Sequence, residues 1–126
     1  MTDQELFDRV ATHLLTQNRK SQSLNGACQY RHYTGLKCAI GVLIPDELYR
    51  TAFEGQGIDT YARPSSWSAD ILHAAGILES QVHLAKRLQD CHDDYEPHEW
   101  VYQLKTIAID HDLDFNLSPS TLDTQP

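Results

Sequence analysis

The stretch that most constrains this chain is residues 28–47, CQYRHYTGLKCAIGVLIPDE. It combines two cysteines and two tyrosines with a glycine turn, and it leads directly into an apolar run closed by Pro45. That run, residues 39–44, is too short for periodicity to distinguish a buried strand from a helix. The flanking sequence is typical of amphipathic helices and linkers. We therefore expect residues 28–47 to form the centre of the fold.

Apolar residues at helical spacing predict helices on both sides of this stretch. A capping box, with Thr2 as N-cap and Glu5 reaching back to it, starts a helix over residues 3–16. Pro45 suits the first position of a short helix. Further helices are expected at residues 69–75 (capped by Ser68 and ended by Gly76), at 81–92 (capped by Ser80) and at 97–110. Residues 55–68 are expected to form a loop.

The two arms around Thr34-Gly35, residues 28–33 and 36–40, contain residues that favour strands, which predicts a short β-hairpin. A lone hairpin is marginally stable, so it must pack against helices. The expected fold class is α+β: a mainly helical single domain of four to five amphipathic helices packed on this hairpin, with an all-α fold as the alternative. The domain spans residues 1–115, a polar tail follows at 116–126, and no internal repeat is evident.

Charge is distributed unevenly along the chain. The formal net charge is −8, and it arises entirely after residue 89, where nine acidic residues accompany a single lysine. Residues 9–45 contain five basic residues and no acidic one. Five charges over this length are too sparse for a duplex-binding face, so we expect no binding to duplex nucleic acid. The acidic third is typical of a solvated surface or of a face for a basic partner.

Compartment follows from two absences in the sequence. No apolar run approaches the roughly 20 residues of a membrane span, and the start of the chain lacks a basic-then-apolar signal peptide. We therefore expect a cytoplasmic protein without a membrane partner. Three cysteines are an odd number, which together with this compartment favours reduced thiols over a disulfide framework.

A combination of short motifs resembles a group of small phage- and prophage-encoded proteins. The first block comprises Cys28, Tyr30, Arg31, Gly35, Lys37-Cys38-Ala39-Ile40-Gly41, Leu43-Ile44-Pro45-Asp46-Glu47, Tyr49 and Glu54-Gly55. The second block comprises Leu88-Gln89, His92-Asp93 and Trp100. The resemblance covers roughly residues 6–113. It implies a phage or prophage origin and an accessory role in the host cytoplasm, and it implies no mechanism.

Thiols and imidazoles offer one possible chemistry. Three thiolates and one imidazole are a ligand set that zinc accepts. The candidates are Cys28, Cys38, Cys91 and His92. Zinc motifs place ligands in close pairs such as Cys-x2-Cys, and this chain has no such pair. Burial of the cysteines as small apolar groups is the simpler interpretation, so no cofactor is expected and zinc remains the alternative.

Nucleophilic catalysis is a second possibility. Cys38 or Cys28 could act as nucleophile with His92 as base and with Asp93 or Asp110 orienting the imidazole. A cysteine in apolar surroundings has a raised pKa and is inert, which weighs against this interpretation. A small metal- or cysteine-dependent hydrolase using Cys38, His92 and Asp93 is therefore the alternative function, and the sequence favours a protein without catalysis.

Anion binding makes use of the basic segment. Arg31 and Lys37 lie on opposite arms of the expected hairpin, and Tyr30 and Tyr33 add stacking surfaces beside them. Positive charge next to aromatic rings is what a nucleotide requires. We therefore expect an accessory protein that works by binding either a host protein or a small anionic, nucleotide-like ligand at Tyr30, Arg31, Tyr33 and Lys37. The partner's identity and the oligomeric state are not encoded in any recognisable motif.

Overall fold

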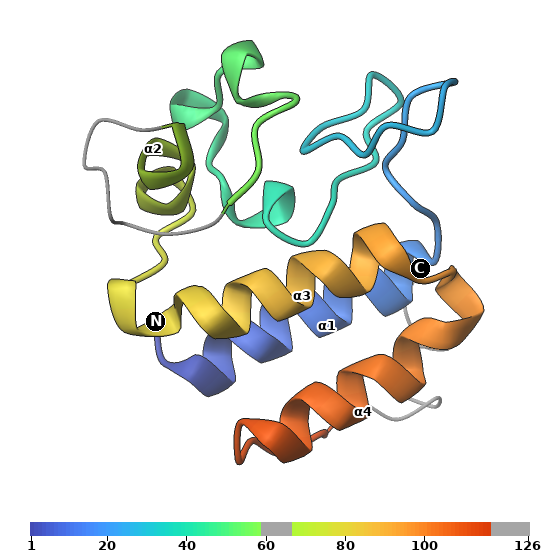
Figure 1. The fold of residues 1–126 in the computed structure, drawn as a ribbon, viewed down its shortest axis with the longest axis vertical. Helices are drawn as coiled ribbons and strands as arrows, with labels where there is room; N and C mark the ends of the chain where they lie inside the picture. Colours follow the sequence, from blue (N-terminus) through green and yellow to red (C-terminus); the bar gives the residue numbers. More distant parts are fainter. Residues whose placement is uncertain (59–66, 117–126) are drawn as a thin grey trace.

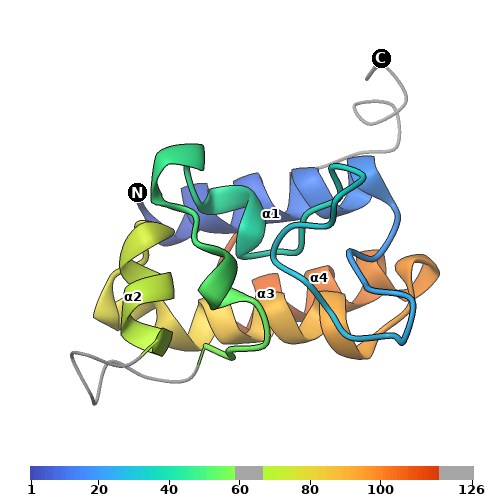
Figure 2. The same cartoon turned by 90° about the horizontal axis from the view of Figure 1, so that it is seen from above.

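Four α-helices carry the fold in the computed structural model, which describes residues 1–58 and 67–116 (Figure 1). They are α1 (Asp3–Gln17), α2 (Trp67–Ala74), α3 (Val82–Asp94) and α4 (Trp100–Asp110). Helices α1, α3 and α4 contact one another, and α4 runs back along the pair formed by α1 and α3. Residues 18–58 and α2 cover one side of this three-helix layer, as Figure 2 shows from above.

The core lies between the three long helices and the segment that covers them, which we call the covering segment (residues 18–58 together with α2). Phe7 and Leu14 of α1, Leu88 of α3 and Leu104 of α4 are fully buried, and the helical spacing of such residues explains why each helix turns one face inward. Trp100, at the start of α4, is also fully buried, and its indole N–H donates to the Tyr95 carbonyl (3.0 Å). The apolar run predicted from the sequence joins this core through Ala39, Ile40, Leu43 and Ile44.

Helix ends follow the local signals in part. The capping box of α1 is confirmed: Glu5 N–H donates to Thr2 Oγ1 (3.1 Å) and Thr2 N–H donates to Glu5 Oε1 (2.8 Å). Gly76 follows α2 with a φ of 74°, as a C′ glycine should. Helix α2 begins at Trp67, so Ser68 lies inside its first turn. Helix α3 is preceded by a 3₁₀ turn, Glu79–Gln81, in place of a direct Ser80 cap.

The predicted α+β class is wrong, and the all-α alternative fits. Residues 1–58 and 67–116 contain no β-strand; the expected hairpin reduces to one isolated antiparallel bridge between Arg31 and Lys37. The two arms do not extend into a β-ladder because a backbone N–H group beyond the bridge on each arm donates to a side chain and not to the opposite arm. Ile40 N–H donates to Gln89 Oε1 (3.0 Å), and Tyr30 N–H donates to Glu54 Oε1 (2.9 Å).

Two consecutive turns of the same design replace the hairpin, and we call them the paired turns (residues 23–27 and 32–36). Each is bracketed by one bridge, Gln22 with Cys28 and Arg31 with Lys37, so the pattern repeats after nine residues. In each turn the glycine N–H donates three residues back, from Gly26 to Ser23 and from Gly35 to His32, both at 2.9 Å. Both glycines have positive φ, which a three-residue loop of this kind requires. The structure thus contains a local repeat that the sequence analysis missed.

The helix expected after Pro45 is also replaced. Three 3₁₀ turns occupy this segment, at Gly41–Leu43, Asp46–Leu48 and Thr51–Phe53. Of the loop expected at residues 55–68, positions 59–66 lie outside the described residues. The predicted polar tail lies outside them as well, apart from Asn116.

Candidate functional site

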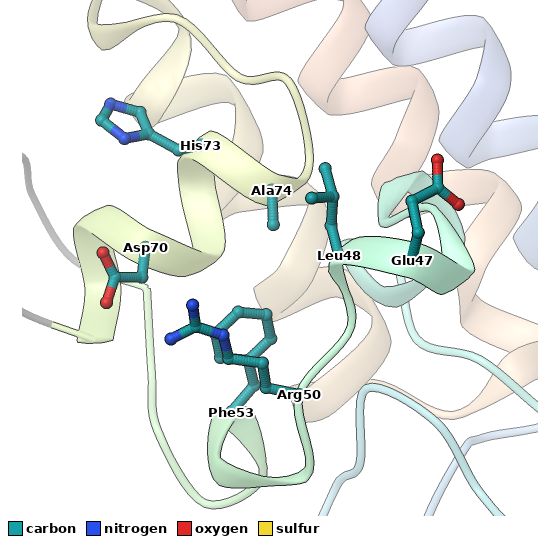
Figure 3. Close-up of a pocket in the computed structure, with 7 residues that line it drawn as sticks. All are labelled: Glu47, Leu48, Arg50, Phe53, Asp70, His73 and Ala74. Carbon is teal, nitrogen blue, oxygen red and sulfur yellow. The ribbon is translucent and has the colours of Figure 1, made fainter.

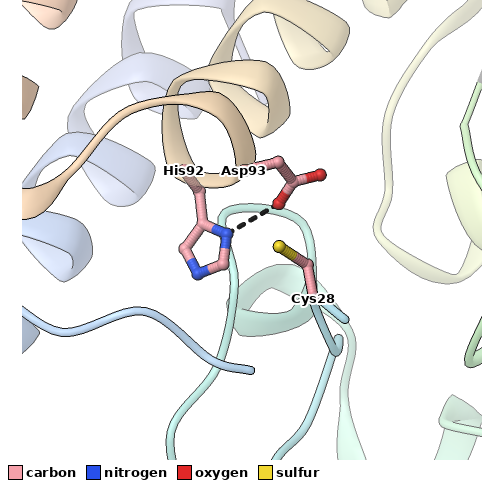
Figure 4. A group of neighbouring side chains, drawn as sticks. All are labelled: Cys28, His92 and Asp93. Carbon is pink, nitrogen blue, oxygen red and sulfur yellow. Dashed lines mark hydrogen bonds and ion pairs between the residues drawn. The ribbon is translucent and has the colours of Figure 1, made fainter. Parts of the chain in front are cut away.

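A polar cluster at the carboxyl end of α3 contains several of the residues singled out in the sequence (Figure 4). The Asp93 carboxylate is its hub. Its Oδ1 atom accepts from His92 Nδ1 (2.7 Å) and from Gln89 Nε2 (2.8 Å). The Cys28 sulfur, from the segment that follows the first turn, lies within 4.8 Å of a carboxylate oxygen of Asp93. The cluster therefore ties residues on one face of α3 to the segment that covers them.

The tautomer of His92 follows from its two hydrogen bonds. Ser21 N–H donates to Nε2 (3.0 Å), so Nε2 carries no hydrogen, and Nδ1 must hold the ring proton that it donates to Asp93. The imidazole is fully buried and stacks on Trp100, with 5.7 Å between ring centroids. Both nitrogens of His92 thus have protein partners, and neither is directed at open space.

Thiol chemistry is suppressed at all three cysteines. Burial, reinforced by the neighbouring Asp93 carboxylate, raises the pKa of the Cys28 thiol to about 11. Burial raises the pKa of Cys38 to about 12, and it does the same at Cys91. Only the thiolate is a good nucleophile, so each cysteine is inert at neutral pH. Asp110, the second predicted orienting residue, is instead paired with Arg87 (2.8 Å) on the protein surface.

The cluster also contains a set of potential metal ligands. Cys28, His92 and Asp93 each offer one ligand atom, and these atoms lie within 4.8 Å of one another, so the group could hold a metal ion. The sequence placed Cys38 and Cys91 in such a set, and neither belongs to this group. The structure brings in Asp93 in their place. Cys28 and Asp93 also line a cavity of about 220 Å³ shared with Cys38 and Lys86.

The hydrogen bonds of His92 oppose metal binding. An ion at this place would use the Nδ1 lone pair, so the ring proton would have to move to Nε2. There it would face the N–H of Ser21, which now donates to Nε2 at 3.0 Å. Two buried donors left face to face cost about 1–3 kcal/mol, and the Ser21 backbone would have to move to relieve them. The cluster as built is better suited to holding the covering segment on α3.

The four residues predicted to bind an anion do not form one open site. Arg31 and Lys37 are opposite each other across the bridge, but Arg31 Nη2 is engaged by the Ile44 carbonyl (2.8 Å) and by Asp46 (2.9 Å). The ring of Tyr49 lies 4.5 Å from the Arg31 guanidinium carbon. Tyr30 is buried, and its hydroxyl donates to the Gln56 carbonyl (2.6 Å). Arg31 therefore braces the fold, and its charge is not free to receive a ligand.

Glu54 is an organising residue that the sequence reasoning missed. Its Oε1 accepts from Tyr30 N–H (2.9 Å), and its Oε2 accepts from Arg31 N–H (3.1 Å) and from the Tyr49 hydroxyl (2.6 Å). A carboxylate that accepts three hydrogen bonds fixes the second turn against the 3₁₀ segment. The only sign in the sequence that Glu54 has a structural role is its place in the Glu54-Gly55 motif.

The paired turns present large side chains to solvent. Leu24 is fully exposed at the tip of the first turn, and Tyr33 is 92 % exposed at the equivalent position of the second. The His32 and Tyr33 rings lie 4.4 Å apart. A shallow surface hollow of about 420 Å³ lies between the two tips, lined by Ser23, Leu24, Asn25, Gln29, His32 and Tyr33. Tyr33 is thus the one predicted ligand-binding residue that is fully available at the surface.

The base of the paired turns is held firmly on α1. Lys37 N–H donates to Gln17 Oε1 (3.0 Å), and the Lys37 carbonyl accepts from Gln17 Nε2 (2.9 Å) and is bonded to His13 Nε2 (2.8 Å). The Gln17 amide therefore pairs with the Lys37 backbone as a neighbouring strand would. With His92 holding Ser21, both ends of the turn segment are fixed to the helical layer.

Comparisons of the chain with protein-family models, with curated proteins and with solved structures found no match. Among the described residues, no helix is both long and apolar enough to cross a membrane.

Proposed function

We propose that this chain is a non-catalytic binding protein that engages a partner protein through the paired turns. In keeping with the phage and prophage resemblance, it would act as an accessory protein on a host protein in the bacterial cytoplasm. The observation that carries the proposal is the exposure of Leu24 and Tyr33 at equivalent turn tips. Two large side chains left in solvent on a braced scaffold contribute no burial to the fold, whereas their burial in a partner's surface would stabilise a complex.

Rigidity supports this role. Protein interfaces gain most from a few anchors, often tyrosines, that are presented without a large loss of conformational entropy. Here the turns are closed by their own hydrogen bonds, and their bases are held by Gln17 and His92. Leu24 and Tyr33 are therefore presented by backbone that is already ordered before a partner arrives.

Charge indicates the chemistry of the partner. Residues 9–45 carry no acidic side chain. Lys20 pairs with Glu96 and Arg31 with Asp46. Arg19 and Lys37, by contrast, form no ion pair with any residue in 1–58 or 67–116. Two uncompensated cations in the segment that carries the apolar tips fit a partner surface with an apolar pocket and an acidic rim.

The same geometry argues against the alternative hydrolase. Cys38 is buried with a raised pKa, its sulfur accepts the Gly41 N–H (3.3 Å), and His92 has both ring nitrogens bonded to protein groups. A catalytic base needs a free nitrogen within reach of a proton, and a nucleophile needs access. The polar cluster has a sufficient role in anchoring the covering segment.

The proposal is tested with the full-length chain as bait in a bacterial lysate, using quantitative mass spectrometry and then affinity measurement on the purified partner. The test variant is Leu24→Ser with Tyr33→Ser. The matched control is Leu78→Ser with Tyr102→Ser, which removes the same residue types from exposed positions elsewhere. Loss of two anchors at about 1–2 kcal/mol each predicts an affinity loss of at least roughly thirtyfold.

The control variant should bind like the unaltered chain. Equal retention of the partner by the turn variant would refute the proposal, as would the absence of any partner whose binding distinguishes the two double variants. Circular dichroism of both variants is the check on folding, because the substituted side chains are exposed and should leave the helix content unchanged.

A further inference from the structure

A second hollow lies between the 3₁₀ turns of residues 46–53 and α2 (Figure 3). Figure 1 shows that α2 and the paired turns lie at opposite ends of the segment that covers the helical layer. We call this second hollow the Arg50 hollow. Its volume is about 290 Å³, close to the lower end of the range for small-molecule sites, which is roughly 300 Å³. The lining residues are Glu47, Leu48, Arg50, Phe53, Asp70, His73 and Ala74.

The floor of this hollow is apolar and held in place. Phe53 is 2 % exposed and makes edge-to-face contacts with Tyr49 and Trp67, both with 6.3 Å between ring centroids. Tyr49 in turn is fixed by Glu54 and covered by Arg31. The wall that carries Arg50 is therefore braced by the same contacts that hold the second turn.

Three charged side chains around the floor take part in no ion pair within residues 1–58 and 67–116. Arg50, Glu47 and Asp70 line one hollow, yet none of them forms a side-chain ion pair with any residue in 1–58 or 67–116. Figure 3 shows the Arg50 guanidinium directed toward the α2 side of the hollow, where Asp70 lies. A cation and an anion that share a small hollow without meeting leave room for a molecule that carries both opposite charges.

We infer that the Arg50 hollow binds a small zwitterion, an α-amino acid with an apolar side chain. Its carboxylate would accept two hydrogen bonds from the planar Arg50 guanidinium, and its ammonium would donate to Asp70. Its side chain would cover Leu48, which is 48 % exposed. The hollow's mixed charge excludes a simple anion such as phosphate, because Glu47 and Asp70 would repel it.

Binding is measured on the full-length chain by NMR chemical-shift titration with L-phenylalanine. Two analogues divide the contacts: 2-phenylethylamine lacks the carboxylate, and 3-phenylpropionate lacks the ammonium. Saturable shifts at Phe53 and Ala74 are expected with L-phenylalanine, and each analogue should bind at least about tenfold more weakly. Lack of saturable shifts up to about 10 mM, or equal binding of all three compounds, would overturn the inference.

Variants assign the charges. Arg50→Ala should weaken L-phenylalanine at least about tenfold without weakening 2-phenylethylamine, while Asp70→Asn should weaken L-phenylalanine without weakening 3-phenylpropionate. Arg19→Ala, at an exposed arginine outside the hollow, is the matched control and should bind normally. Unchanged L-phenylalanine affinity in both Arg50→Ala and Asp70→Asn would place the ligand elsewhere and refute the assignment.

This site is independent of the paired turns. Figure 1 places α2, which lines the hollow, and the paired turns at opposite ends of the covering segment. Arg50→Ala should therefore retain the partner protein, and the Leu24→Ser, Tyr33→Ser variant should retain L-phenylalanine. If one of the two proposals fails, the other is still tested by its own experiment: partner binding for the paired turns and the L-phenylalanine titration for the Arg50 hollow.

Discussion

Gly41 is the position where one added carbon should do the most damage. A Cβ built there would lie 2.0 Å from the Tyr30 carbonyl oxygen, 2.8 Å from its carbon and 3.0 Å from the Tyr30 Cα. All three contacts are backbone, so no side-chain rotation can relieve them. Gly41→Ala must therefore push the first 3₁₀ turn away from the segment that leads into the second of the paired turns.

The size of the effect follows from what that movement breaks. Restoring an ordinary contact moves the oxygen from 2.0 Å to about 3.4 Å from the new carbon. A shift of that size at Tyr30 disrupts its N–H bond to Glu54 (2.9 Å) and its carbonyl's bond from Cys38 N–H (3.4 Å). One charge-assisted and one neutral hydrogen bond contribute about 2–4 kcal/mol together. Reduced freedom of the unfolded chain offsets about 0.4–1 kcal/mol, which leaves a net loss of about 1–3.6 kcal/mol.

Urea unfolding followed by circular dichroism measures this loss. Gly57→Ala is the matched control, because a Cβ at Gly57 meets nothing within 4 Å and its φ is not positive. The control should be neutral or slightly stabilising, while Gly41→Ala lowers the free energy of unfolding and the melting temperature by roughly 10 °C. If Gly41→Ala unfolds within about 0.5 kcal/mol of the unaltered chain, the close approach of Gly41 to Tyr30 is not part of the fold.

Two further predictions concern pH. Burial, opposed by its bond to Lys37, lowers the pKa of His13 below its ordinary value of 6.5, so the unfolded chain binds more protons and stability falls as pH drops through that value. His13→Gln should lose less stability between about pH 7 and pH 5 than the exposed-site control His83→Gln, and equal losses would contradict this. Because the pKa of the Cys28 thiol is raised to about 11, its rate of alkylation should still be rising with pH at about pH 10. Asp93→Asn should shift this pH–rate curve to lower pH, because the neighbouring carboxylate charge is removed. A plateau of the rate near pH 9.0, the ordinary thiol pKa, in the unaltered chain would contradict the prediction.

Helices were predictable to the extent that their signals are local. The start of α1 is specified by Thr2 and Glu5, and the end of α2 by Gly76, within four residues of each boundary. Apolar spacing also identified α3 and α4, although the 3₁₀ turn before α3 moved its start. The hairpin prediction failed because extended-chain preference at residues 28–40 does not say what will pair with that chain.

The sequence identified several residues of the candidate site by their chemical type, but it did not predict what those residues do in the fold. Cys28, His92 and Asp93 do meet, as chemistry-bearing residues often do. The role of these residues depends on the Ser21 N–H, which donates to His92 Nε2. That nitrogen is therefore not free to accept a proton as a catalytic base would. Arg31 is a similar case, because Asp46 and the Ile44 carbonyl engage a charge that the local sequence leaves without an acidic neighbour.

By itself, the sequence indicated the four α-helices and their apolar faces, and it placed the run at residues 39–44 in the core, because caps and periodicity act within a few residues of chain. Only the tertiary structure decided which groups accept the hydrogen bonds of the backbone N–H groups in the covering segment. Its partners are side chains 24 residues away at Glu54, 49 at Gln89 and 71 at His92. Each buried N–H needs some acceptor, and which one reaches it depends on how α3 and the 3₁₀ segment pack. That packing turned an expected hairpin into two anchored turns.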